Sequence, residues 1–523
     1  MKGMNKPSLD AIRAEAMKLH FQQALDLLNL YTLQELGFDG LLLKSKILRG
    51  TYAYASALEY ALMALDGALP GKQTLQALLE QARCLFALNR SDEALEILQT
   101  LTSNRHPSAE AEQAALLREA RIQTALICSE IGRVDEALAI LEDLPVVTCS
   151  EESGEEEIRK LVDSLCLQGD LYSYKASMPG AEQSEWFNLA EAMYGRAMET
   201  CELLPASDFR SLRLSLVYNN RADLYEGLEL FEEAAQDYDA AMNLAEPIED
   251  PQIFDLNGYK ADLLMSLGNL YALREDEVTA QRLLEKARGL IDEIHNVQQD
   301  SYLAKCLYLQ GMCRLYSSED AAQEDLENSC HLYEKLVSEG RDKEERLANA
   351  RFYLAGVLSD SDENLERNRR LYGQILPVYE RIWQRNPELY LSNMASLYND
   401  LGRISYYQKD PDRAIEEYQQ GLELYTQLYR LDEEDLFALF NLVVTRFNLI
   451  SASCNLPQEQ LAGLHMKLAL EELRLIRRKT TDYDSDIWSL LSASRETLLE
   501  QLPDFAEEYD QLQSSLSQDH FLA

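Results

Sequence analysis

A fixed spacing of small and large residues recurs along this chain. Residues 218–242, YNNRADLYEGLELFEEAAQDYDAAM, contain the spaced set Tyr225, Ala234, Tyr238 and Ala241. Nearly the same set returns in the next segment, at Tyr271, Ala280, Leu284 and Ala287. A spacing that repeats indicates units that repeat, so we expect a stack of similar parts whose function lies in the surface that the stack makes.

Helix is predicted for nearly the whole chain. Apolar residues recur at steps of three and four almost everywhere, which is the period of a helix face, and only 13 prolines interrupt 523 residues. Local signals mark where helices start. In KDPDRAIEEY, Asp410 can cap a helix, and Pro411 follows at a position where its missing N–H costs nothing.

The residue types at the repeated positions have a packing reason. Residues 397–425 keep the same spacing with Leu401, Gly402, Ala414, Tyr418 and Gly421. A small residue such as Gly402 or Ala414 lets two helix backbones approach, and a large residue such as Tyr418 fills the gap to the next pair. Each unit is therefore predicted to be two antiparallel helices joined by a short turn.

This pattern resembles the tetratricopeptide repeat (TPR) family, which has Leu-Gly or Leu-Ala and then Tyr in its first helix, and Ala, an aromatic residue and Ala in its second. Residues 218–247 match the family pattern with Ala222, Tyr225, Ala234, Tyr238, Ala241 and Pro247. They depart from it at Arg221, where the family prefers Leu. The resemblance implies an all-α fold: a right-handed superhelical α-solenoid of stacked antiparallel helix pairs, with roughly eleven units.

Breaks in the repeat pattern suggest the domain organisation. The acidic, nonperiodic segment TCSEESGEEE interrupts the repeats, and its like charges favour a solvated connector. After residue 480 the pattern fades into a segment that suits a terminal cap. We expect N-terminal repeats in 1–148, an acidic linker in 149–157, a main repeat array in 158–480, and capping helices with a tail in 481–523.

The charge balance limits the class of partner. The chain has 49 Lys and Arg residues against 90 Asp and Glu residues, a formal net charge of −41. Binding to nucleic acid draws its affinity from basic side chains that displace counterions, and anionic membranes also attract basic segments. We therefore expect no nucleic-acid and no membrane partner. A protein partner with a basic face is compatible with this charge.

The cellular location of the protein is predicted from the N-terminal sequence, the apolar segments and the cysteines. MKGMNKPSLDAIRAEAMKLHF has no uninterrupted apolar region of the kind found in signal peptides. No later segment approaches the roughly 18 consecutive apolar residues of a membrane span. The nine cysteines form no CxxC pair, which favours reduced thiols. A cytoplasmic protein is predicted.

No catalytic or metal-binding motif is recognisable in the sequence. The six histidines are dispersed, and none lies in HExxH or at a zinc-ligand spacing from a cysteine. A phosphate-binding GxxxxGK[ST] loop and a GxSxG nucleophile turn are missing as well. We expect no enzymatic activity, no metal and no cofactor.

The candidate binding residues come from the TPR resemblance. In that family the first helices line a concave groove, and Asn residues just before the Leu-Gly or Leu-Ala step hydrogen-bond an extended peptide. Asn219, Asn220 and Asn399 occupy such places, and an amide that donates and accepts at once suits a peptide backbone. The same register predicts that further residues face the groove: Asp223, Arg403, Tyr406, Tyr407 and Tyr174. The alternative is that the three asparagines are solvated polar residues.

Two basic clusters interrupt the acidity of the chain. They are RNRR, with Arg367, Arg369 and Arg370, and RLIRRK, with Arg474, Arg477, Arg478 and Lys479. Either could bind an acidic segment or a phosphate. They could also pair with Glu residues on neighbouring turns, such as Glu471 and Glu472, which is the interpretation that we prefer.

Recognition is the function that these observations favour. We expect a non-enzymatic scaffold or adaptor that binds a peptide segment or a protein partner in the concave groove. The alternative is a regulator that changes curvature when a peptide or other ligand binds and so releases a partner. An enzyme is the third and least favoured possibility.

Overall fold

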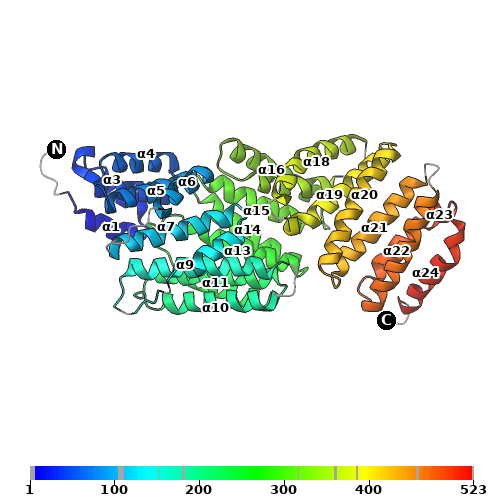
Figure 1. Ribbon diagram of the computed structural model, residues 1–523. Coiled ribbons are helices and arrows are strands. Elements are labelled where there is room, and N and C mark those ends of the chain that lie inside the picture. The colour runs from blue at the N-terminus through cyan, green and yellow to red at the C-terminus, as the bar shows by residue number, and fades with distance from the viewer. Residues whose placement is uncertain are drawn as a thin grey trace. The chain divides into compact units, whose positions relative to one another are not determined.

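The structure, a computed structural model, describes residues 6–103, 111–145, 147–150, 152–178, 183–315, 317–358, 362–384, 387–454 and 459–520. In these residues it contains 24 α-helices, one short 3-10 helix and no strand (Figure 1). The predicted all-α repeat fold is confirmed. The count of about eleven units stays a prediction.

The chain forms two compact units that divide between Lys343 and Glu344. Unit 1 contains α1 (Leu9–Met17), α2 (Phe21–Leu28), α3 (Leu33–Gly50), α4 (Tyr54–Asp66), α5 (Lys72–Ala87), α6 (Ser91–Ser103), α7 (Ala111–Glu130), α8 (Val134–Glu142), α9 (Glu155–Ala176), α10 (Gln183–Cys201), α11 (Asp208–Gly227), α12 (Phe231–Ala245), α13 (Leu256–Leu273), α14 (Glu277–Asp292), α15 (Gln299–Cys313) and α16 (Glu319–Ser338). Unit 2 contains α17 (Glu344–Val357), α18 (Asp362–Trp383), α19 (Pro387–Tyr407), α20 (Pro411–Leu431), α21 (Leu436–Ser453), α22 (Glu459–Lys479), α23 (Asp484–Leu499), η1 (Pro503–Phe505) and α24 (Ala506–His520).

Consecutive helices pair, as α9 with α10, α11 with α12 and α13 with α14 (Figure 1). We call the odd-numbered member of each pair the first helix and the even-numbered member the second helix. A second helix also packs against the first helix of the following pair, as α12 does against α13 and α14 against α15. No pair buries its apolar surface alone, so the stacking that the spacing predicted is required for stability.

One position in the second helices carries the packing pattern. A fully buried alanine occupies it in most pairs: Ala24, Ala57, Ala94, Ala137, Ala190, Ala234, Ala280, Ala322, Ala414 and Ala462. Four residues later, one helical turn on, stands a large buried side chain such as Tyr194, Tyr238 or Tyr418. The predicted alternation of small and large residues is therefore present in most of the described pairs; in α4 the later position is Ala61.

Glycines in the first helices show how closely the paired helices approach. A Cβ atom added to Gly402 of α19 would lie 2.6 Å from the Tyr418 ring of α20, and one added to Gly169 of α9 would lie 2.6 Å from the Tyr194 ring of α10. A side chain at either position would force the tyrosine out of place. These are the close crossings that the sequence spacing predicted.

The turn between first and second helix is also shared. A residue in left-handed conformation ends the first helix at Tyr52, Asn89, Glu229, Glu275 and Lys409, with φ between 58° and 62°. The next N–H then bonds a carbonyl five residues back, as Leu230 to Tyr225 at 2.9 Å and Asp410 to Ser405 at 3.0 Å. This 6→1 bond closes the helix end and sets the reversal of the chain.

The unit boundary at residues 343–344 is a position that the sequence pattern did not single out. The predicted acidic connector, 149–157, lies within the sequence range of unit 1, and Glu155, Glu156 and Glu157 form the first turn of α9. Acidic side chains suit that place because the N-terminal end of a helix carries partial positive charge. The predicted capping segment supplies α23, η1 and α24 of unit 2.

One described helix, α21, is long and apolar enough by composition to cross a membrane. It packs between α20 and α22, and 61% of its 18-residue apolar window is buried inside the protein. Core packing therefore accounts for its apolar character.

Replacing Gly402 by Ala should destabilise unit 2, because the added methyl group would displace Tyr418. We expect a loss of about 1–3 kcal/mol in the free energy of unfolding, measured by urea denaturation. Gly373→Ala in α18 is the matched control, since a Cβ atom there meets nothing within 4 Å. It should be neutral or stabilise by up to about 1 kcal/mol. Equal effects of the two substitutions would contradict the close-crossing account.

Asn368 of α18 stands where most second helices have alanine, and it is fully buried. Neither amide atom has a hydrogen-bond partner within the described structure. A buried polar group without a partner costs stability, so Asn368→Ala should raise the free energy of unfolding of unit 2 by about 1 kcal/mol. A lower urea midpoint for the variant would show that the amide has a stabilising role.

Candidate functional site: the inner face of unit 1

The first helices of unit 1 adjoin one another along one side of the stack. α3 contacts α5, α5 contacts α7, α7 contacts α9, and α9 contacts α11, while α13 contacts α15. Since neighbouring helices come closest on the inside of a bend, we call the side where first helices adjoin the inner face. The predicted groove residues of unit 1 lie on these helices.

One inner-face position repeats in three successive first helices. Asp170 of α9, Asp223 of α11 and Asn269 of α13 each follow the small residue of the helix crossing and precede Leu-Tyr. The segments read GDLY, ADLY and GNLY. Two carboxyl groups and one amide therefore occupy equivalent places in neighbouring pairs.

The tyrosine that fills each crossing also positions the carboxyl group beside it. The Tyr194 hydroxyl donates to Asp170 Oδ1 at 2.7 Å, and the Tyr238 hydroxyl donates to Asp223 Oδ1 at 2.6 Å. Tyr238 also lies 3.0 Å from Glu226 Oε2. In the third pair the packing residue is Leu284, which has no hydroxyl, and the first helix carries Asn269 in place of the acid.

Amide groups connect these carboxyl groups across and along the helices. Asn220 Nδ2 of α11 donates to Asp170 Oδ1 of α9 at 3.1 Å, and Asn269 Nδ2 of α13 donates to Glu226 Oε1 of α11 at 2.7 Å. Within α11, Asn219 Nδ2 lies 3.4 Å from Asp223 Oδ2. We call Asp170, Asp223 and Glu226 the acidic row.

The structure thus places Asn219, Asn220 and Asp223 in one network: Asp223 belongs to the acidic row, and the two asparagines donate to Asp223 and Asp170. Asp170 and Glu226 were not predicted. The repeated GDLY, ADLY and GNLY register was the available signal for Asp170 and Asn269.

Surrounding protein makes ionisation of the acidic row unfavourable. Asp170 and Asp223 are open to solvent, yet the helices around them displace enough water to raise the pKa of Asp170 to about 6 and the pKa of Asp223 to about 7. Their tyrosine partners oppose this effect, whereas the nearby Glu226 charge adds to it at Asp223. Burial also raises the pKa of Glu226. Solvent exposure together with a raised pKa is expected for carboxyl groups that lie in a concave surface.

The inner face closer to the N-terminus is neutralised by the protein itself. Glu80 accepts from Arg49 at 2.8 Å, and Glu119 accepts from Arg83 at 2.5 Å and pairs with Lys160 at 3.1 Å. The hydrogen bonds to the acidic row come instead from hydroxyl and amide groups.

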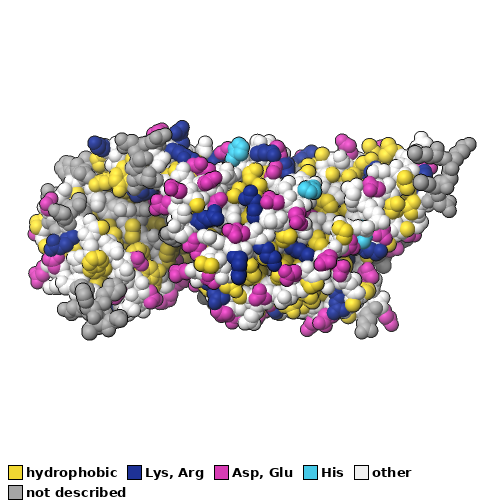
Figure 2. All heavy atoms as spheres, turned by 180° about the vertical axis from the view of Figure 1, so that it is seen from behind, with side chains coloured by type: hydrophobic (Ala, Val, Ile, Leu, Met, Phe, Trp, Pro, Cys, Tyr) yellow, Lys and Arg dark blue, Asp and Glu magenta, His cyan; other side chains and the backbone are white. Residues whose placement is uncertain are grey.

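Lys305 of α15 contacts Asp262 of α13 at 2.5 Å, and its charge partly offsets the rise in the pKa of Asp223 and of Glu226. Figure 2 shows basic and acidic side chains interspersed on the face seen there, as these pairs require.

Tyr174 of α9 is half-buried and packs against the core of the pairs from α5 to α11. Its role as a groove residue stays a prediction.

The other four predicted residues lie on α19 in unit 2. Asn399 Oδ1 accepts from Asn448 Nδ2 at 3.0 Å, which links α19 to the next first helix, α21. Arg403 lies 3.8 Å from Asp400. The rings of Tyr406 and Tyr407 are 5.8 Å apart; Tyr406 packs on the core of unit 2, and Tyr407 is 47% exposed. The eight predicted residues therefore form two sets, one in each unit.

Three residues of the basic clusters pair with acidic residues on other helices or loops rather than on neighbouring turns. Arg369 contacts Glu417 at 3.2 Å, Arg474 contacts Glu508 at 2.8 Å, and Lys479 contacts Glu434 at 3.0 Å. Each of these partners lies on a different helix or loop. The contacts support the structural interpretation of the clusters.

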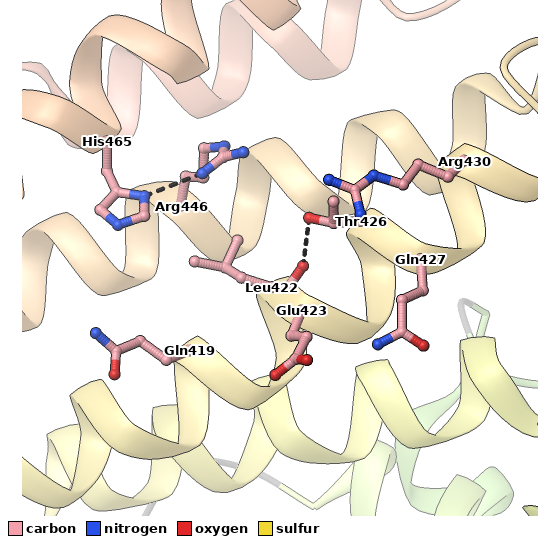
Figure 3. Close-up of a pocket in the computed structure, with 8 residues that line it drawn as sticks. All are labelled: Gln419, Leu422, Glu423, Thr426, Gln427, Arg430, Arg446 and His465. Atoms are coloured by element: carbon pink, nitrogen blue, oxygen red, sulfur yellow. Dashed lines mark hydrogen bonds between the residues drawn. The ribbon is translucent and has the colours of Figure 1, made fainter.

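A polar hollow of about 300 Å³ lies in unit 2 between α20, α21 and α22 (Figure 3). Arg446 lines this hollow. Its guanidinium donates two hydrogen bonds to Glu472, at 2.8 and 2.9 Å, and one to His465 Nδ1 at 3.0 Å. Because arginine can only donate, the neutral His465 ring carries its proton on Nε2. Burial and the Arg446 charge lower the pKa of His465 to about 4. The hollow contains none of the predicted site residues.

Among the described residues, no three His, Cys, Asp or Glu side chains are grouped as they would be around a metal ion. The acidic row is spread along the inner face rather than gathered at a point. Its geometry suits contacts with a ligand that extends along several helices.

The titration of Asp223 should appear in the stability of unit 1. Its pKa in the folded protein lies above the ordinary value near 4, so the folded protein retains a proton that the unfolded chain has lost between about pH 4 and pH 7. Stability therefore falls as pH rises through that window. Asp223→Asn should reduce this fall, measured by urea midpoints at pH 5, 6, 7 and 8.

Tyr238→Phe is the companion variant, because the Tyr238 hydroxyl lowers the pKa of Asp223. Its loss should extend the fall in stability to higher pH. The same pH dependence in the wild type and in Asp223→Asn would contradict the account.

Comparisons with known proteins find solved helical repeat structures at low sequence identity. No protein-family model and no curated protein sequence matches the chain. A tetratricopeptide repeat protein from Parabacteroides merdae is 18% identical, covers 60% of this chain and 98% of its own, and has a TM-score of 0.36. A Rap protein complexed with Competence and Sporulation Factor is 13% identical over 77% of this chain and 98% of its own, with a TM-score of 0.40. Yeast Tom70 is 14% identical over 98% of each chain, with a TM-score of 0.32. The repeat assignment rests on the packing described above, and the chain is similar to solved tetratricopeptide repeat structures.

Proposed function

We propose that the protein is a non-enzymatic interaction scaffold or adaptor, and that the inner face of α9, α11 and α13 binds an extended segment of a partner protein. We further propose that this segment carries basic side chains. A cytoplasmic location completes the proposal and rests on the sequence.

The acidic row is the observation that carries this proposal. Asp170 and Asp223 are open to solvent, are held in place by buried tyrosines, and receive hydrogen bonds from neutral donors. A lysine or arginine side chain laid against them would supply the cation that Arg49, Arg83 and Lys160 supply elsewhere on the same face. Charge-assisted hydrogen bonds of this kind are stronger than those between neutral groups.

Amides beside the acidic row suit the backbone of such a segment. Asn219 and Asn220 of α11 are half-buried, and Asn269 follows on α13. An Asn side chain donates through nitrogen and accepts through oxygen, as a peptide backbone requires. Carboxyl groups would select the side chains of the partner, and amides would hold its main chain.

The alternative function, a regulator that releases a partner, differs from a scaffold because it requires a change of shape. The curvature of unit 1 would have to change when the ligand binds. A scaffold binds with the fold unchanged.

Binding of a charged probe tests the proposal. Fluorescent 12-residue peptides of alternating Lys-Ser, Asn-Ser and Glu-Ser are titrated against the protein and followed by anisotropy. We expect the Lys-Ser peptide to bind best, and Asp170→Asn with Asp223→Asn to weaken it on the order of tenfold, about 1.4 kcal/mol. Affinity should also rise between pH 5.5 and 7.5 as the two carboxyl groups ionise.

The matched control removes the same formal charge from the second helices of the same pairs. Glu185 of α10 and Glu233 of α12 are exposed, so Glu185→Gln with Glu233→Gln should leave the affinity nearly unchanged. An equal loss in both double variants would mean that net charge alone attracts the peptide, and the proposed site would be wrong.

A further inference from the structure

Unit 1 contacts itself across more than 200 residues of sequence. The Phe254 N–H donates to the Leu19 carbonyl at 3.0 Å, joining the loop before α13 to the turn between α1 and α2. Beside this bond, His20 lies with Nε2 at 3.0 Å from Asp250 and Nδ1 at 2.9 Å from Glu15. We call this contact between the N-terminal turns and residues 248–256 the seam.

Aromatic rings form the apolar part of the seam. The Phe254 ring centroid lies 6.0 Å from that of Phe21 and 5.5 Å from that of Tyr52. Phe21 begins α2, and Tyr52 lies in the turn between α3 and α4. Residues from two N-terminal helix pairs therefore contact the Phe254 ring. Ring contacts at these separations are favourable.

Asp255 ties the seam to the main stack. Its Oδ2 accepts from the hydroxyls of Tyr52 at 2.8 Å and Tyr302 at 2.9 Å, and its Oδ1 accepts from Asn296 at 2.9 Å. Tyr52 comes from the N-terminal side of the seam, whereas Tyr302 belongs to α15. The Asp255 carboxyl group therefore joins the segments around α15, which are neighbours in the stack, to the distant turn between α3 and α4.

The N-terminal side of the seam has its own small core. Ile12, Leu28, Leu36 and Ile47 belong to a cluster of α1, α2 and α3 that is separate from the cores of later pairs. The buried cluster that links α4 to α5 consists of Ala57, Ala61 and Cys84. Residues 8–66 thus contact the rest of unit 1 at two places. One is the packing of α3 and α4 on α5, which includes the ion pair of Arg49 with the buried Glu80, and the other is the seam.

We propose that residues 8–66 form a clasp that closes unit 1 at the seam and opens there. The seam consists of one backbone hydrogen bond, the ring contacts of Phe254 and the polar contacts of His20 and Asp255. An interface of so few side chains opens more readily than a continuous helix stack. While the clasp is closed, the N-terminal pairs contact both α5 and the loop before α13, which restricts changes in the curvature of unit 1. This inference does not depend on the identity of any partner.

Hydrogen exchange of the whole protein tests the clasp directly. Leu19→Cys with Phe254→Cys places two thiols where one backbone hydrogen bond joins the residues. The oxidised form should lock the seam, and the reduced form, without the Phe254 ring, should loosen it. We expect exchange in residues 21–31 and 248–256 to be slower than wild type when oxidised and faster when reduced, by on the order of tenfold. Residues 436–453 of unit 2 should not change.

A second pair of variants keeps the test independent of the disulfide. Tyr52→Phe and Tyr302→Phe each remove one hydroxyl from Asp255 and keep the ring. Tyr52→Phe should speed exchange on both sides of the seam, whereas Tyr302→Phe should leave residues 21–31 at the wild-type rate. Equal effects of the two substitutions, equal exchange in oxidised and reduced forms, or failure of the two thiols to join would overturn the proposal.

Discussion

The rest of this structure depends on the close crossing of the two helices in each pair. Glycine or alanine on one helix lets the other approach, and a tyrosine or leucine then fills the space beside it, as at Gly402 and Tyr418. The crossing leaves an apolar surface that only the next pair can cover. Repetition of this one contact extends the stack along the chain.

The same tyrosines connect packing with the candidate site. Tyr194 and Tyr238 are almost completely buried, yet their hydroxyls reach Asp170 and Asp223 on the inner face. Each tyrosine that fills a helix crossing thus also holds the carboxyl group of one aspartate in place by a hydrogen bond. Where Leu284 fills the crossing instead, the inner face carries Asn269. The core and the candidate site are therefore coupled through single side chains.

The sequence predicted what is local and periodic. Helix content, pairing and the small and large positions follow from spacings within about 20 residues, and the structure confirms them. Asn219, Asn220 and Asp223 were predicted as groove residues from the first-helix register that the TPR resemblance implies, and their role in binding stays a prediction. The hydrogen bond from Asn220 to Asp170 joins residues 50 apart, and the contacts of His20 and Tyr52 span over 200. Such pairs depend on how the stack bends, which no local spacing specifies.

The central claim is that a partner segment lies along the inner face of unit 1. Hydrogen–deuterium exchange of the full chain, with and without a saturating Lys-Ser peptide, locates the bound segment most directly. The account predicts slower exchange in residues 161–176, 215–227 and 261–273, which are inner-face stretches of α9, α11 and α13. Protection confined to second helices or to unit 2 would contradict it.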